Sequence, residues 1–127
     1  MCAIVDLYSQ KEFLKKHKNH KSVTVYKTLR KNIYGELKSI HYDELYVPGI
    51  TKSNSKAKLQ KRDNTEVNRG IHVFLTKERA EIDNAYGYKT IVPFKALIED
   101  LICVECNGRA VFRKVELSNK EYERAIK

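Results

Sequence analysis

Hydrophobic positions in this chain recur at a spacing of two over several short stretches, which is the period of β-strands. Val23 and Val25 show this spacing, whereas Ile71–Leu75 is apolar on both faces, as in a fully buried strand. Pro93 is expected at a sheet edge or a bulge, because proline cannot donate to a ladder. The predicted strands are Ser22–Lys31, Leu37–Tyr42, Ile71–Leu75, Tyr88–Phe94, Leu101–Cys106 and Arg109–Leu117.

Three helices and one tight turn are marked by the residues at their ends. A Ser or Thr precedes each helix, and its side-chain oxygen can accept a hydrogen bond from the first turn. Gly87 can end the second helix, since glycine adopts the left-handed conformation without strain. Asn107-Gly108 is a strong two-residue hairpin signal. The predicted helices are Gln10–His17, Lys77–Tyr86 and Asn119–Ile126, capped by Ser9, Thr76 and Ser118.

The order of these elements indicates the fold class. Val47–Asn68, rich in Ser, Asn and Lys, is predicted to be a long, flexible, basic loop. Strands and helices do not alternate strictly, as a doubly wound parallel sheet requires. We therefore expect one α+β domain over residues 1–127, a mainly antiparallel β-sheet with short helices packed on one face. A chain of 127 residues can bury enough surface to fold without a metal or disulfide, so no cofactor is implied.

Charge is the strongest compositional signal. The formal net charge is +9, which predicts an anionic partner, either nucleic acid, a phosphorylated small molecule or an acidic protein surface. Lys11–Lys31 holds eight Lys and Arg against one acid, and Lys52–Arg62 holds five against none. The first half of the chain is therefore expected to carry any electrostatic contact.

Short apolar runs and an odd number of cysteines indicate a cytoplasmic protein. No stretch approaches the roughly 20 apolar residues that cross a bilayer, so no membrane partner is expected. Three cysteines cannot all pair, which favours a reducing compartment. Cys103 and Cys106 form a C-x-x-C pair, but residues three apart in a strand point to opposite faces, which is wrong for sharing a metal ion. The remaining candidate metal ligands are Cys2 and four scattered histidines. A core role is favoured over metal binding.

Several side chains could bind an anionic ligand. His72 lies within an apolar strand, where it is either a hydrogen-bonded semi-buried histidine or a general base. Arg113 lies in a row of apolar residues, so it either extends to water or points into a pocket that needs an anion. Phe74 could stack on a base and Asn84 could read its edge, with Arg109 nearby for phosphate. Common catalytic motifs are absent, so an enzyme is unsupported.

The segment Gly70–Ala80 resembles a G-I-H-x-F-x-T-x-E-x-A strand–helix unit of small proteins and terminal domains of phages and large DNA viruses. A V-Y-K-x-x-R strand often precedes that unit, and Val25–Arg30 matches it. The chain is also similar in size and predicted fold to Thoeris anti-defence proteins of phages. That resemblance implies a homo-oligomer that sequesters cyclic ADP-ribose-type signals at subunit interfaces, through positions such as Phe74, Asn84 and Arg109 or Arg113.

Four functions stay open at this point. The favoured one is a non-catalytic viral protein that sequesters a phosphorylated nucleotide signal of host antiviral defence, with Arg30, Arg109 and Arg113 neutralising phosphate. A nucleic-acid-binding protein is the second, because tyrosines such as Tyr26, Tyr34, Tyr42 and Tyr46 could stack on single-stranded bases. The third is an inhibitor of an acidic host protein, and the fourth is an enzyme that acts on a nucleotide with His72 as the base. The chain also resembles ADP-ribosyltransferase-like folds, but more weakly.

Overall fold

A computed structural model describes residues 3–39, 44–84, 87 and 89–127, and these residues form an α+β fold, as the sequence predicts. Every strand pairing in this part of the chain is antiparallel. The strands are β1 (Ala3–Ile4), β2 (Ser22–Lys31), β3 (Leu37–Lys38), β4 (Leu45–Tyr46), β5 (Gly49–Lys52), β6 (Glu66–Val67), β7 (Ile71–Phe74), β8 (Thr90–Leu97), β9 (Leu101–Val104), β10 (Arg109–Phe112) and β11 (Lys114–Leu117). The helices are α1 (Leu7–Lys16), α2 (Lys77–Asp83), the single 3-10 turn η1 (Ile98–Asp100) and α3 (Asn119–Ile126).

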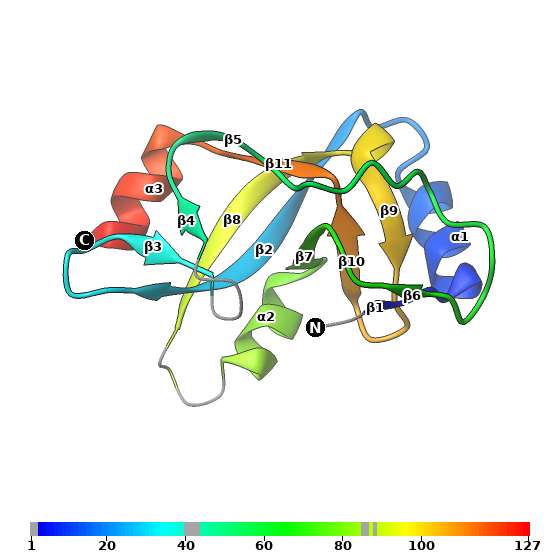
Figure 1. Ribbon diagram of the computed structural model, residues 1–127, viewed down its shortest axis with the longest axis horizontal. Coiled ribbons are helices and arrows are strands. Elements are labelled where there is room, and N and C mark those ends of the chain that lie inside the picture. The colour runs from blue at the N-terminus through cyan, green and yellow to red at the C-terminus, as the bar shows by residue number, and fades with distance from the viewer. Residues whose placement is uncertain (1–2, 40–43, 85–86, 88) are drawn as a thin grey trace.

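The main sheet has the strand order β5-β11-β8-β2-β7-β10-β9, and the β3–β4 hairpin extends it from the end of β2 (Figure 1). Its longest ladder joins β2 to β8, from Ser22↔Leu97 to Leu29↔Thr90. On the other side β2 meets β7 at one pair, Tyr26↔Phe74. The central strand β2 therefore has a long, regular neighbour on one side and a brief contact on the other.

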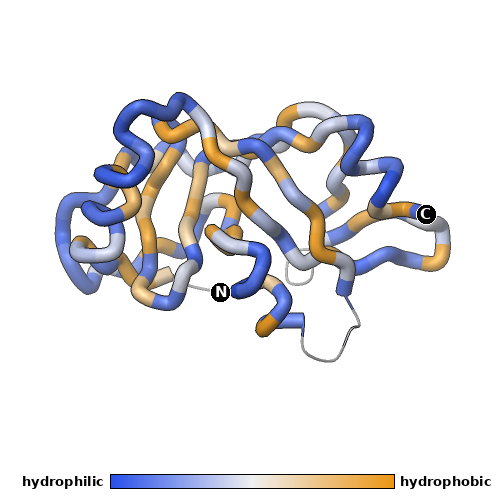
Figure 2. The backbone as a smooth tube through the Cα atoms, turned by 180° about the vertical axis from the view of Figure 1, so that it is seen from behind, coloured by the Kyte–Doolittle hydropathy of each residue, from blue (hydrophilic) through white to orange (hydrophobic). Residues whose placement is uncertain are grey.

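Alternate residues of the central strands form the core. Val25 and Leu29 of β2 pack with Val92 and Phe94 of β8, and each is almost fully buried. Figure 2 shows hydrophobic residues following the strands while the helices and outer loops are mostly hydrophilic. A smaller cluster, which includes Ile102, lies between the β1–β6 pair and the strands β9 and β10. Both clusters are built from strands, so helix packing is secondary in this fold.

The three helices pack on different parts of the sheet, α1 on β9, α2 on β2, β7 and β8, and α3 on β8. The predicted caps of α2 and α3 are confirmed, because Thr76 Oγ1 accepts from Arg79 N and Ser118 Oγ accepts from Glu121 N. The predicted start of α1 is wrong. That helix begins three residues earlier, after Asp6, and Ser9 lies inside it with its hydroxyl donating to the Asp6 carboxylate.

Three other predictions differ from the structure. Val47–Asn68 is not one loop, because it contains β5, which pairs with β11, and β6, which pairs with β1. Pro93 lies inside the central strand β8, opposite Tyr26 of β2. On its other side β8 pairs with β11 only at Lys95, so no strand pairs with Pro93 on that side and its missing N–H is tolerated. The long strand predicted to begin at Arg109 is divided into β10 and β11 at Arg113.

The hairpin between β9 and β10 is present but has a longer turn than predicted. Glu105 N donates to the Arg109 carbonyl, which leaves residues 106–108 as a three-residue loop. Only Gly108 of the loop has a positive φ, at 81°, as expected for a loop with the last residue in the left-handed conformation. The parts of predicted elements that fall on residues 40–42, 85–86 and 88 lie outside the described residues, as do Cys2 and Tyr42.

Candidate ligand pocket between strands β2 and β7

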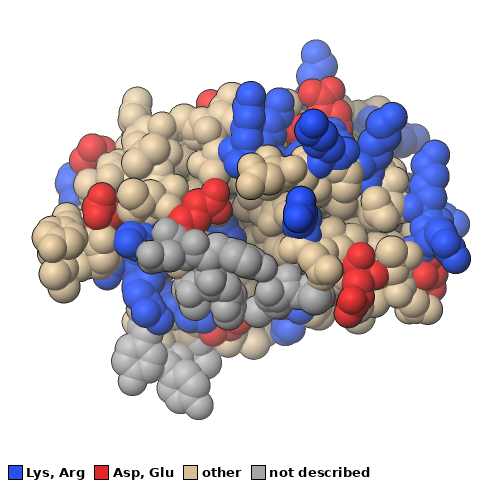
Figure 3. Space-filling view, in the orientation of Figure 1, with Lys and Arg blue, Asp and Glu red and all other residues tan. Residues whose placement is uncertain are grey.

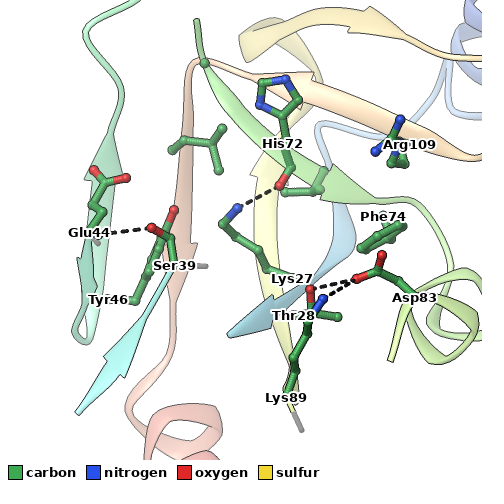
Figure 4. A pocket seen from close by; sticks show the side chains of 13 residues that line it. Lys27, Thr28, Ser39, Glu44, Tyr46, His72, Phe74, Asp83, Lys89 and Arg109 are labelled. Atoms are coloured by element: carbon green, nitrogen blue, oxygen red, sulfur yellow. Dashed lines mark hydrogen bonds and ion pairs between the residues drawn. The ribbon is translucent and has the colours of Figure 1, made fainter. Parts of the chain in front are cut away.

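The two strands β2 and β7 separate after their single paired position, and a pocket of about 100 Å³ lies in the gap (Figure 4). A cavity of that size accommodates several water molecules or a small charged group. The β3–β4 hairpin, the end of α2 and the start of β10 complete its walls. The lining side chains used below are Lys27, Tyr46, His72, Phe74, Lys89 and Arg109.

The side chain of Lys27 is half-buried, and it lines this pocket. Its Nζ donates to the His72 carbonyl at 2.9 Å and lies 5.7 Å from the ring centroid of Tyr46. The side chain thus takes the place of a ladder hydrogen bond where the strands separate. Burial lowers the pKa of Lys27 to about 8, while the charge of Glu44 acts in the opposite direction. No carboxylate among the described residues lies within 4 Å of its ammonium.

His72 is held as a neutral acceptor. Burial, and next the charge of Lys27, lower the pKa of its imidazole, and a hydrogen bond with the Gly70 backbone opposes this. The Nε2 atom is buried and has no hydrogen-bond partner in the described part of the chain. Buried polar atoms are normally satisfied by protein, water or ligand.

Gly70 brings β7 close to its neighbour at this point. A Cβ atom on Gly70 would lie 2.4 Å from Val111 Cγ1, and the residue has a φ of 125°. Both the space and the backbone conformation therefore require glycine. The close approach fixes the position of β7, and with it that of His72 two residues later, beside the pocket.

Phe74 and Arg109 form the side of the pocket next to β10. They are direct neighbours in the β7–β10 ladder, so both side chains project from the same face. The Arg109 Nε lies 2.9 Å from Glu105 Oε2, and the other oxygen of this buried carboxylate accepts from Ile4 N. The ion pair orients the guanidinium at the edge of the pocket beside the Phe74 ring (Figure 4).

The end of α2 contributes a second cation. Lys89 Nζ lies 3.3 Å from Asp83 Oδ2, and the same oxygen accepts from the Thr28 hydroxyl at 3.2 Å. Together with Glu44, the pocket lining holds three cationic and two anionic side chains. Because Lys89 and Arg109 each have a carboxylate partner, Lys27 is the cation whose charge the protein compensates least.

Three of the predicted ligand-binding residues meet here, namely His72, Phe74 and Arg109. Asn84 lies beside the pocket but does not line it. Its amide donates to the Lys89 carbonyl at 2.7 Å and accepts from Lys89 N at 3.0 Å, so it closes the turn after α2. Arg30 is exposed where β2 pairs with β3 and is also outside the lining.

Arg113 is bound by the protein itself. Its guanidinium donates to the backbone carbonyls of Ala57 and Glu99 and to the Asp100 carboxylate. These acceptors satisfy the charge without a phosphate, and they attach the chain after β5 to η1. The prediction that Arg113 binds an external anion therefore finds no support in its surroundings.

Lys27 lines the pocket but was not selected in the sequence analysis, and Tyr46 was named there only as a ring that could stack on a base. Lys27 lies between Val25 and Leu29 in the inward row of β2, and a lysine in such a row is itself a signal. Tyr46 is 2% exposed, so it does not serve as an exposed stacking platform. Burial, and then Glu44, raise the pKa of its phenol.

The cysteines do not form a site in the described residues. Cys103 is buried in β9, where burial raises the pKa of its thiol to about 12, and Cys106 is exposed in the hairpin loop. The core role predicted for this cysteine pair is confirmed for Cys103 and wrong for Cys106. Over residues 3–39, 44–84, 87 and 89–127, no three His, Cys, Asp or Glu side chains lie together as metal ligands would.

Comparison of the chain with known protein families, with curated proteins and with solved structures gives no match. In the described portion, no helix has both the length and the apolar character to span a membrane. The pocket and its charges are therefore the evidence on which a function can be argued.

Proposed function

We propose that the chain is a non-catalytic binding protein for a small phosphorylated ligand of the nucleotide class, with a phosphate group in the pocket between β2 and β7 and the rest of the ligand outside it. The observation that carries the proposal is Lys27, a buried ammonium that the described residues leave without a carboxylate within 4 Å. A buried charge is unfavourable unless it is paired, and a phosphate oxygen would pair it.

The other lining groups fit the remaining parts of such a ligand. Arg109 and Lys89 add positive charge at the edge of the pocket, where a second phosphate could lie. The Phe74 ring offers an apolar face for a base. The resemblance of Gly70–Ala80 to viral strand–helix units places the ligand, within this proposal, among the nucleotide signals of host antiviral defence.

Thermal unfolding with added ligand tests the proposal. The probes are ATP, cyclic dinucleotides, cyclic ADP-ribose isomers and inorganic phosphate, each with the wild type, Lys27→Met and Lys95→Met. Lys95 is an exposed strand lysine, so its variant controls for the loss of one charge. At 100 times Kd, a ligand stabilises its protein by roughly 2.7 kcal/mol.

The expected result is stabilisation of the wild type and Lys95→Met by at least one nucleotide, with no effect on Lys27→Met. Stabilisation by inorganic phosphate alone would reduce the ligand class to simple oxyanions and overturn the nucleotide assignment. Unchanged melting with every probe, or equal binding by Lys27→Met, would overturn the proposal as a whole.

A further inference from the structure

Two basic stretches that are far apart in the sequence run side by side in the fold. One is residues 11–21, in α1 and the turn after it, and the other is residues 52–62, after β5. Figure 1 shows the second stretch crossing the top of the molecule and passing along α1. We call the ten Lys and Arg side chains of these two ranges the basic band.

Gln10 joins the two stretches. This residue is 3% exposed, and its amide donates to the Gln60 carbonyl at 2.7 Å and accepts from Val104 N at 3.1 Å. At the start of α1, Leu7 N donates to the Asp63 carboxylate. Helix and extended segment are thus attached to each other, and to β9, by specific hydrogen bonds. The band is a fixed surface of the fold.

The charges of the basic band are not compensated by the protein. All ten side chains are exposed, and none lies within 4 Å of a carboxylate of the described residues. Glu12 is the one acidic residue in the two ranges. Figure 3 shows Lys and Arg gathered over the top and right of the molecule, where α1 and the 52–62 segment lie. Such a field attracts an extended polyanion.

The segment after β5 presents its lysines in a regular row. Lys56 and Lys58 are exposed, whereas Ala57 and Leu59 are partly buried and pack on the two core clusters. The carbonyl of Ala57 is held by Arg113, which fixes the segment at its middle. Side chains two residues apart on an extended chain lie about 6.6 Å apart, a spacing suited to successive phosphates of a strand.

Tyr8 adds an exposed ring to the α1 part of the basic band. The side chain is 75% exposed, and Lys11 and Lys15 follow it at intervals of three and four residues on α1. Residues at those intervals lie on one face of a helix. An aromatic ring beside a row of cations can stack on an unpaired base, whereas bases within a duplex are already stacked.

We infer that the basic band and Tyr8 bind single-stranded nucleic acid through its phosphates and one stacked base, without dependence on sequence. The lysines of 11–21 and 52–62 contact the backbone from two sides, and Tyr8 selects a single strand over a duplex. This surface is separate from the pocket between β2 and β7, so binding here does not depend on Lys27.

Fluorescence anisotropy with a labelled 20-nucleotide oligothymidine and with a 20-base-pair duplex tests the inference, each over a range of salt concentrations. The variants are Lys56→Gln/Lys58→Gln, Tyr8→Ala, and Lys95→Gln/Lys120→Gln as a control that removes the same charge from other exposed sites. Anionic phosphatidylserine vesicles serve as a second probe, and Lys27→Met is measured in parallel.

Removing two phosphate contacts should make the slope of log K against log salt shallower by about 1.4 for the single strand. The control variant should keep the wild-type slope. Tyr8→Ala should weaken binding to the oligothymidine by about five-fold or more, with the slope unchanged and duplex binding unaffected. Lys27→Met should bind as the wild type does.

Three outcomes would overturn the inference. The first is equal loss in the control variant, which would mean that net charge alone causes the binding. The second is tighter binding to the duplex than to the single strand. The third is binding to vesicles without binding to oligothymidine, which would assign the basic band to a membrane surface.

Discussion

Lys27 is unfavourable for folding, and within the proposed function it is favourable for binding. Lowering the pKa of this ammonium from 10.5 to about 8 corresponds to roughly 3 kcal/mol of lost stability for the charged form. The hydrogen bond to the His72 carbonyl returns about 1 kcal/mol. A residue that weakens the fold at this cost is typical of a binding site.

Lys27→Met should therefore stabilise the protein by about 2 kcal/mol at pH 7 in the absence of ligand, since methionine has a similar length and no charge. Urea unfolding of the two proteins measures the difference. Lys95→Met, which changes an exposed side chain, should differ from the wild type by less than about 0.5 kcal/mol. A less stable Lys27→Met protein would show that the ammonium is satisfied within the fold.

The same lysine predicts a pH dependence with a defined sign. Between pH 8 and 10.5 the unfolded state binds more protons at Lys27 than the folded state does. The free energy of unfolding of the wild type should therefore rise with pH across this window, relative to that of Lys27→Met. Unfolding of both proteins at pH 7, 8, 9 and 10 measures this, because the other titrating groups are common to both. A constant difference would contradict a lowered pKa.

At the scale of elements, Gly70 determines how closely β7 approaches β10. Gly70→Ala places a Cβ 2.4 Å from Val111 in a backbone with a positive φ, and we expect it to cost about 2 kcal/mol or more. Gly35 also has a positive φ but has open space around it, so Gly35→Ala should cost about 1 kcal/mol. Thermal unfolding of the two variants compares them. Equal losses would show that backbone conformation alone requires glycine at position 70.

Elements were predictable where their determining contacts are local. Thr76 and Ser118 cap helices through an N–H three residues away, so a short window of sequence contains the whole interaction. The strand β5 was missed because the bonds that make it a strand come from β11, more than sixty residues later. The position of Pro93 was predicted wrongly for the same reason. A proline is tolerated inside β8 because the neighbouring strand β11 does not pair with β8 at that residue.

At the scale of the molecule, the pocket was predictable in part. His72, Phe74 and Arg109 were selected as polar, aromatic and basic side chains on adjacent predicted strands. Lys27 was not selected. It lines the pocket because β2 and β7 stop pairing there, and the pattern of residues in a strand does not show where two strands separate. The uneven charge was visible in composition, but the contact of Gln10 with Gln60 that unites the two basic stretches was not.

The central position of β2 has a consequence for synthesis on the ribosome. Its long ladder partner is β8, and the pair Ser22↔Leu97 joins residues 75 positions apart. The nascent chain must therefore carry an unpaired β-strand while most of the protein is still being translated. Folding dominated by such distant contacts is slow. Lys21 precedes this strand and Lys31 ends it, and charged residues in such positions oppose aggregation of an exposed strand.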